Sequence, residues 1–256
     1  MGIAHLVHRK AALADLTDEH PPRQPMIDDA ARAFCAAQRT DRESHRRQGT
    51  WRREIPAASD TTGNTGTVAA NIIYGSGIPD DRELRLCGDV TDGWRAVELG
   101  VSPWRNAVTF AANGAKAIAV DPDGERLAGV RRAAEAAEVT VQCLATDLAD
   151  LGDITSGTCD VVVAAQTLLD VDDLSRVFRQ VHRILKASMP FVISVPHPFA
   201  GVSFDEPYGA GPRTVGEWFI TLGRSNFRVD HLLELGVTGT HPAPTTLVLR
   251  ARKEGS

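Results

Sequence analysis

The segment from Arg95 to Asp121, RAVELGVSPWRNAVTFAANGAKAIAVD, constrains the fold of this chain more than any other. Short apolar runs at 96–99 and 117–120 flank a helix-length stretch at 106–112, which Asn113-Gly114 is suited to end. Two buried strands on either side of a helix within about 30 residues form a βαβ unit, and such a unit requires a parallel sheet. In parallel sheets, ligands bind where the carboxyl ends of the strands meet the helix N-termini, so we expect a binding site after residues 99 and 120.

The residues at these strand ends indicate the kind of ligand. Gly100 allows a sharp turn and a close approach of the backbone, and the amides that open the next helix favour an anionic group. Asp121 lies about 20 residues past Gly100, where an acid can bind the hydroxyls of a ribose. We therefore expect a cofactor that contains a nucleoside. The alternative is an ordinary strand–turn–helix in which Gly100 serves only the turn.

Composition limits the class of protein. A chain of 256 residues can hold one α/β domain with an appendage, and a net charge of −5 gives no support for a nucleic-acid partner. The chain has no apolar run of about 18 residues for a membrane span, and its first residues are too interrupted by charge for a secretion signal. The four cysteines, at positions 35, 87, 143 and 159, form no CxxC pair, so we predict buried thiols in the cytoplasm and no metal site.

Two regions of the chain differ in composition and in the pattern of apolar residues. Residues 1–66 are polar, with one helix expected near 28–38 and a linker composition at 59–67, so we expect a poorly ordered or partly helical leader. Residues 67–256 carry the regular apolar pattern of a folded α/β domain.

Within this domain we expect seven strands, at 96–99, 117–120, 139–144, 160–165, 191–195, 227–235 and 245–252, and helices at 80–87, 106–112, 124–138, 172–186 and 214–222. The connection at 236–244 is too short for a helical crossover, so the last two strands should be antiparallel neighbours. The predicted fold class is α/β: a Rossmann-like, doubly wound, mostly parallel seven-stranded sheet with an antiparallel last strand.

This arrangement resembles the class I S-adenosylmethionine-dependent methyltransferases, over about residues 72–253. It is most similar to bacterial small-molecule enzymes through YGxxIPxxxELRLxGD at 74–89, VELG at 97–100, NAVxFA at 106–111, VDP at 120–122, DLADL at 147–151, DDLxRVFRQVHRxLK at 172–186 and SxPHPF at 194–199.

The resemblance implies S-adenosylmethionine (SAM) as the cofactor and assigns roles along the matched motifs. By this resemblance, Glu98 and Gly100 would bind the methionine part of the cofactor and Asp121 the ribose. Asp147 and Leu148 would contact the adenine. Residues 165–167 would lie near the sulfonium. The full set of expected cofactor-binding residues is Tyr74, Glu98, Gly100, Ser102, Asn106, Asp121, Pro122, Asp147, Leu148, Ala165 and Gln166. Tyr74 and the turn that follows it have two possible roles, to close over the cofactor cleft or only to pack, and the sequence does not decide between them.

The cofactor loop departs from the family pattern. Ser102 and Trp104 stand where the family has its second and third glycines, and a glycine with positive φ resists replacement by either residue. The Trp104 indole has two possible positions: over the cleft, stacked on a ligand, or inside the methionine pocket, where it would abolish binding.

The resemblance implies methyl transfer to a small-molecule acceptor. The protein must mainly align donor and acceptor and exclude water. His197 is the expected general base for an oxygen or nitrogen acceptor, and a rim-shaping role is its alternative. Two other functions stay open: an inactive methyltransferase-like binding or scaffold domain with a decayed loop, and a nicotinamide-dependent oxidoreductase, which the absence of GxGxxG makes less favoured.

Overall fold

The computed structural model describes residues 71–200, 208–209, 213–239 and 243–255. The leader expected over 1–66, with its helix near 28–38, lies outside the described residues, and so does most of the loop at 199–213. Within the described part, no helix is long and apolar enough to cross a membrane.

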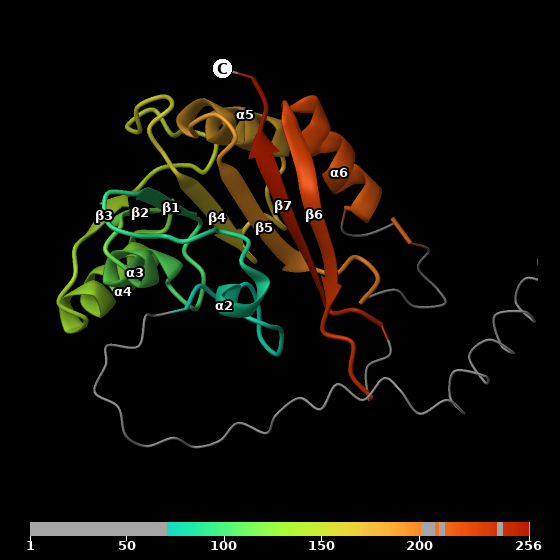
Figure 1. The fold of residues 1–256 in the computed structure, drawn as a ribbon, viewed down its shortest axis with the longest axis horizontal. Helices are drawn as coiled ribbons and strands as arrows, with labels where there is room; N and C mark the ends of the chain where they lie inside the picture. Colours follow the sequence, from blue (N-terminus) through green and yellow to red (C-terminus); the bar gives the residue numbers. More distant parts are fainter. Residues whose placement is uncertain (1–70, 201–207, 210–212, 240–242, 256) are drawn as a thin grey trace, which may run out of the picture. The chain divides into compact units, whose positions relative to one another are not determined.

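A seven-stranded sheet forms the centre of the domain (Figure 1). Its strands are β1 (Arg95–Leu99), β2 (Lys116–Val120), β3 (Val141–Leu144), β4 (Val161–Ala165), β5 (Pro190–Pro196), β6 (Phe227–Leu235) and β7 (Thr246–Lys253). The order across the sheet is β3-β2-β1-β4-β5-β7-β6. The pairs among β1 to β5 are parallel, whereas β7 runs antiparallel to both β5 and β6. The predicted fold class is therefore confirmed.

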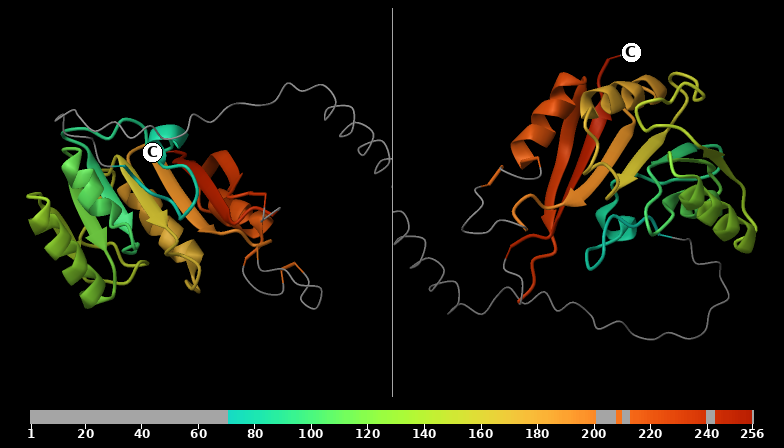
Figure 2. Two further views of the ribbon diagram at one scale, coloured as in Figure 1. Left: turned by 90° about the horizontal axis from the view of Figure 1, so that it is seen from below. Right: turned by 180° about the vertical axis from the view of Figure 1, so that it is seen from behind.

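Helices cover the two faces of the sheet (Figures 1 and 2). Helices α5 (Leu174–Ile184) and α6 (Val215–Arg224) pack on one face, where Phe178 and Trp218 join the largest apolar cluster. On the other face, α3 (Asn106–Ala112) contributes Phe110 to a second cluster, and α4 (Gly124–Ala136) packs over a third. The strands alternate accordingly: Val97 and Leu99 point to the first cluster, and Ala96 to the second.

The predicted element boundaries differ from the structure mainly at two places. Helix α2 (Asp81–Leu84) is one turn long, shorter than the expected 80–87, because Arg85 takes a left-handed conformation that ends it. Strand β3 begins at Val141, two residues later than expected, because Glu138 has a φ of 54° and the chain turns there. Helix α6 begins after Thr214, whose side chain forms a capping box with Glu217.

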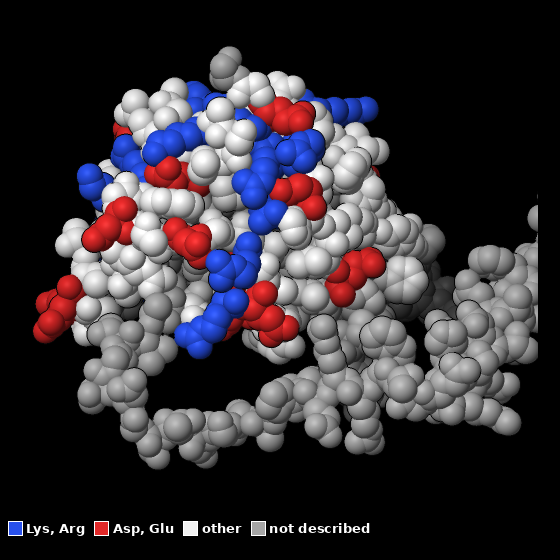
Figure 3. Space-filling view, in the orientation of Figure 1, with Lys and Arg blue, Asp and Glu red and all other residues white. Residues whose placement is uncertain are grey.

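Basic residues gather on the face that β6 and β7 present in Figure 3. Arg250 and Arg252 of β7 both bind the carboxylate of Asp230 on β6, at 2.8 and 2.7 Å. This cross-strand network ties the antiparallel pair together.

Candidate functional site

A cavity lies where the strand order of the sheet reverses. From β1, the chain proceeds to β2 and β3 on one side and later to β4 and β5 on the other, so the switch point falls between β1 and β4. The cavity has a volume of about 490 Å³. Residues 101–103 after β1 and residues 166–167 after β4 line it, together with residues of α4. This is the position at which an open α/β sheet binds its ligand.

Glu98, at the end of β1, is enclosed within the loop that follows it. Its carboxylate accepts hydrogen bonds from the Ser102 amide at 3.1 Å, the Ser102 hydroxyl at 2.7 Å and the Ala107 amide at 2.8 Å. Burial raises the pKa of Glu98, and these hydrogen bonds oppose that shift. Glu98 thus fastens the loop to the first turn of α3.

The loop accommodates both of its departures from glycine. Neither Ser102 nor Trp104 has a positive φ; the left-handed conformation falls instead on Arg105, with φ 51° and ψ 56°. Trp104 is half-buried against the cluster that contains Tyr74 and Phe110, and it does not line the cavity. The indole therefore does not fill the candidate ligand space.

Gly100 is required by both its conformation and its surroundings. Its φ is +75°, and an added Cβ would lie 2.5 Å from the Cβ of Thr167. The Thr167 hydroxyl donates to the Leu99 carbonyl at 2.6 Å, so this side chain bridges the ends of β4 and β1. Thr167 therefore occupies the space beside Gly100 and shapes one wall of the cavity.

Asp121 ends β2 with its carboxylate held in place. One oxygen accepts the Val101 amide at 2.7 Å and the other accepts the Asp123 amide at 2.8 Å. The guanidinium of Arg126 lies 3.6 Å away; Asp121 is only 1% exposed, whereas Arg126 is 59% exposed. A carboxylate offers about four acceptor positions, so each oxygen keeps capacity for another donor.

Residues 71–78 cross the carboxyl edge of the sheet and are bonded to it. The Asn106 side chain exchanges two hydrogen bonds of 2.9 Å with the backbone of Ile73. The Tyr74 carbonyl accepts from the side chains of Gln166 and Ser194. Asn106 thus serves to attach this segment, and Gln166, which has a φ of 63° and lines the cavity, helps to hold it.

The Tyr74 ring is fully buried. Its hydroxyl donates to the Asp81 carboxylate at 2.6 Å and lies 3.1 Å from the Cys87 sulfur. Burial is the main cause of the raised pKa values of both Tyr74 and Asp81. The hydroxyl does not reach the cavity in this structure, and packing is the alternative that the geometry favours.

The remaining expected residues lie along the same edge. Pro122 is exposed next to Asp121, and Asp147 is exposed after β3, where its carboxylate accepts the Ala149 amide at 2.7 Å. Leu148 packs against the main core cluster. Ala165 is buried at the end of β4 and does not line the cavity.

His197 follows β5 and is 5% exposed. Its Nδ1 accepts the Phe199 amide at 3.1 Å, so in the neutral ring Nε2 carries the proton and donates to Glu234 at 2.9 Å. Both ring nitrogens are engaged. A role as general base would require one of these two hydrogen bonds to open.

The cavity also has residues that the sequence analysis missed. Arg105, Arg126 and Arg132 all line it. Arg126, Gly129 and Arg132 follow one another at three-residue steps on α4, a spacing that places them on one helix face and that was visible in the sequence.

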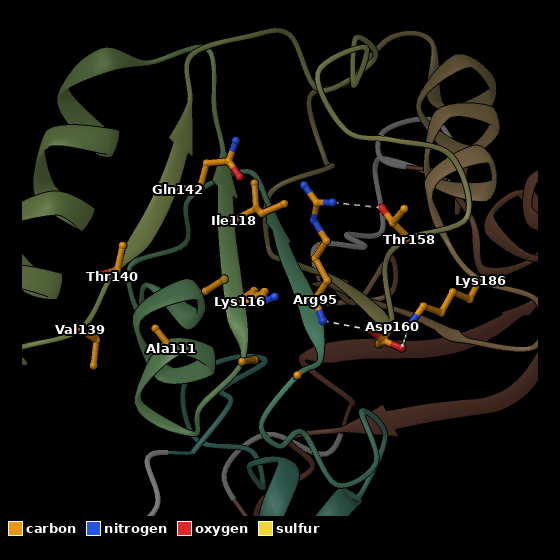
Figure 4. Close-up of a pocket in the computed structure, with 13 residues that line it drawn as sticks. Arg95, Ala111, Lys116, Ile118, Val139, Thr140, Gln142, Thr158, Asp160 and Lys186 are labelled. Carbon is orange, nitrogen blue, oxygen red and sulfur yellow. Dashed lines mark hydrogen bonds and ion pairs between the residues drawn. The ribbon is translucent and has the colours of Figure 1, made fainter.

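A larger cavity, of about 750 Å³, lies at the opposite edge of the sheet (Figure 4). Arg95, Lys116 and Lys186 line it near the amino ends of the strands. Its acid, Asp160, is engaged by the Lys186 ammonium at 2.6 Å and by the Arg95 amide at 2.9 Å. Because ligands of open α/β sheets bind at the carboxyl edge, we assign the candidate site to the smaller cavity.

Comparisons with known proteins concern the fold. A family model described as a methyltransferase domain matches residues 97–193, which run from within β1 to within β5. No curated protein matches the chain. Among solved structures, a SAM-dependent methyltransferase from Mesorhizobium loti is similar at 23% identity and a TM-score of 0.58, over 67% of this chain and 96% of that one.

Two further structures share the fold with different chemistry. Geranyl diphosphate methyltransferase in complex with SAM is similar at 16% identity and a TM-score of 0.55, over 67% of this chain and 82% of that one. The [4+2]-cyclase SpnF is similar at 15% identity and a TM-score of 0.55, over 69% of this chain and 81% of that one. The fold is therefore compatible with more than one reaction.

The sheet order and the cavity at its switch point define the domain as a class I methyltransferase fold. The family model matches residues 97–193 and the structural neighbours share the fold, in agreement with the fold that the sequence resemblance implies.

Proposed function

We propose that this chain binds SAM in the cavity at the switch point and transfers its methyl group to a small-molecule acceptor. The observation that carries the proposal is the cavity of about 490 Å³ between the β1 and β4 loops, two of whose lining residues, Val101 and Arg126, contact the fixed carboxylate of Asp121. Its volume falls within the roughly 300–1,000 Å³ of small-molecule sites.

Asp121 suits a ribose. Two backbone amides hold the carboxylate at the end of β2, and both oxygens retain acceptor positions for a pair of hydroxyls. The guanidinium of Arg126 would have to move from its place beside Asp121, and its long, exposed side chain allows this. Exposed Asp147 and the adjacent Leu148 would then border the adenine.

The loop supplies rigidity. Glu98 binds Ser102 and Ala107, which holds the loop against α3, and Gly100 with Thr167 shapes the wall for the methionine part of the cofactor. When bound, SAM supplies a methyl group on an already electrophilic sulfonium. The protein's contribution is then to orient the two ligands and exclude water. His197 lies at the same edge, and we propose that it orients the acceptor side of the site through Glu234.

A second candidate function is an inactive domain that keeps the fold. Its specific support is that Thr167 fills the space beside Gly100, while Arg126 lies against Asp121. If these contacts are permanent, the cofactor is excluded. The three described cysteines are free, which supports a reducing compartment such as the cytoplasm for either function.

Calorimetric titration of the full chain with S-adenosylhomocysteine (SAH) tests the proposal. We expect saturable binding that weakens about 10–100-fold in Asp121→Asn, because hydrogen bonds to a charged carboxylate contribute about 1.5–3 kcal/mol each. Asp121→Asn keeps an acceptor for only one of the two backbone amides, so circular dichroism must first show that the variant is folded. Asp153→Ala, at an exposed aspartate of the β3–β4 connection, is the matched control and should leave the affinity unchanged.

Arg126→Gln separates the two candidate functions. If Arg126 competes with the ribose for Asp121, its removal should leave SAH affinity unchanged or tighten it. Absence of binding to the folded wild type and to Arg126→Gln alike would favour the inactive domain.

A further inference from the structure

Arg105 departs from two local preferences at once. It is the N-cap residue of α3, where asparagine, aspartate and serine are favoured, and its side chain makes no capping hydrogen bond. Its backbone is left-handed, with φ 51°, a conformation that favours glycine and asparagine. Asparagine would satisfy both preferences. Departures of this kind concentrate at functional sites, so the arginine side chain itself needs an explanation.

The side chain of Arg105 extends over α4 toward a second arginine. A Cβ added at Gly129 would lie 3.6 Å from Nε of Arg105 and 4.0 Å from Nη2 of Arg132. The two guanidinium groups therefore flank one point above the helix. Both residues line the cavity of about 490 Å³ beside the cofactor loop.

These two guanidinium groups have no anionic partner in the described part of the chain. Arg126, the third arginine of the cavity, is paired with Asp121 and Asp123. In contrast, neither Arg105 nor Arg132 forms an ion pair or a side-chain hydrogen bond with any described residue. The two other acids that line the cavity, Glu125 and Asp170, do not pair with them. Neighbouring guanidinium groups repel each other, and an oxyanion between them removes the repulsion and accepts hydrogen bonds from both.

We infer that Arg105 and Arg132 form an oxyanion clamp that holds a phosphate or carboxylate group of the methyl acceptor. That the ligand is an acceptor rests on the proposed methyltransferase function; the oxyanion site itself does not. SAM and SAH both carry a carboxylate on their methionine part, so the cofactor is the competing source of the oxyanion, and competition with SAH in the test below separates the two sources. Two unpaired guanidinium groups repel a sulfonium, and an anionic acceptor would compensate both charges, so binding of acceptor and SAM should be coupled.

The test is a titration of the full chain with inorganic phosphate and, separately, with acetate, followed through the arginine Nε–H signals by NMR at low ionic strength. We expect saturable binding of at least one of these anions. It should be at least fivefold weaker in Arg105→Asn and in Arg132→Gln, and within twofold of wild type in Arg131→Gln. Arg131 is the matched control, since it neighbours Arg132 on α4 but does not line the cavity.

Two further readouts exclude a merely structural role. Arg105→Asn should raise Tm by about 2–4 °C while it weakens anion binding, because asparagine suits the cap and the left-handed backbone. Saturating phosphate should tighten binding of SAM, which carries the sulfonium charge, more than binding of SAH, which lacks it.

The inference is overturned if neither anion binds saturably, or if all three arginine variants respond alike. It is also overturned if phosphate competes with SAH, or if Arg105→Asn and Arg132→Gln weaken SAH as much as they weaken the anion, because the arginines would then hold the cofactor. Anion binding without any SAH binding would reject the methyltransferase proposal and leave the oxyanion site standing.

Discussion

Gly100 links the backbone of the cofactor loop to the packing of β4. Its φ of +75° disfavours any side chain, and a Cβ there would collide with Thr167 at 2.5 Å. We predict that Gly100→Ala lowers the free energy of unfolding by about 2–4 kcal/mol. Gly124→Ala is the control, since no heavy atom lies within 4 Å of its added Cβ and its φ is not positive. Equal urea-unfolding midpoints for the two variants would contradict the assigned conformation of the loop.

Ser102 provides a prediction with a pH dependence. Its hydroxyl donates to Glu98 and lowers a pKa that burial holds above the ordinary 4.5. The stability that Glu98 contributes is thus present below pH 4.5 and lost as the pH rises through the native pKa. Ser102→Gly raises that pKa further, so it should destabilise the fold by about 1–2 kcal/mol near neutral pH and by less in mild acid. Urea unfolding at both pH values measures this. A variant as stable as wild type at neutral pH would show that the family's glycine is preferred here.

At the residue scale, the sequence could predict positions but not every contact. Asp121 and Gly100 follow buried strands, so the βαβ pattern alone places them at the carboxyl edge. Tyr74 bonds to Asp81, and Asn106 bonds to Ile73, because of the way residues 71–90 fold over the sheet. The spacing of apolar residues in this segment does not predict that path. Arg105 was unpredictable for a similar reason: its left-handed backbone breaks the local preferences on which sequence analysis relies.

At the scale of elements, the β6–β7 pair depends on one carboxylate. Partial burial raises the pKa of Asp230, but hydrogen bonds from Arg250 and Arg252 outweigh it and hold that pKa well below the ordinary 3.8. The stability from this group is therefore present above pH 3.8 and lost as the pH falls through the native pKa.

We predict that Asp230→Asn lowers the free energy of unfolding by roughly 1 kcal/mol near neutral pH, the upper range for solvent-screened ion pairs. The difference should shrink as the pH falls below 3.8, because the carboxylate then takes up a proton in the unfolded wild type while it stays ionised in the native state. Chemical denaturation across that range measures it. A difference that stays constant with pH would mean that the network contributes through packing and not through charge.

Whether a segment is a helix or a strand was predictable where its apolar residues recur at regular steps. In α5, the three- and four-residue steps of Val177, Phe178, Val181 and Ile184 match the buried face of the helix. Boundaries were less predictable, because left-handed residues such as Arg85 and Glu138 end or delay elements without a glycine to signal it. The connection from β3 to β4 contains turns and no helix, in keeping with its Gly and Ser content.

At the scale of the whole domain, the position of the site follows from topology. The reversal of strand order between β1 and β4 opens the carboxyl edge there, and the loops after these two strands line the cavity. The parallel units and the short last connection were enough to predict this edge from the sequence. The acceptor was not predictable, since much of the loop at 199–213 is unpatterned and lies outside the described residues.

The most direct test of the central claim is a crystal structure of the full chain with SAH at a concentration that saturates the protein in solution. The account predicts the nucleoside in the cavity between the β1 and β4 loops, with the ribose hydroxyls at hydrogen-bonding distance, about 2.5–3.0 Å, from the Asp121 carboxylate and with Arg126 displaced from it. SAH bound with its ribose away from Asp121, or Arg126 still seated on that carboxylate, would contradict it.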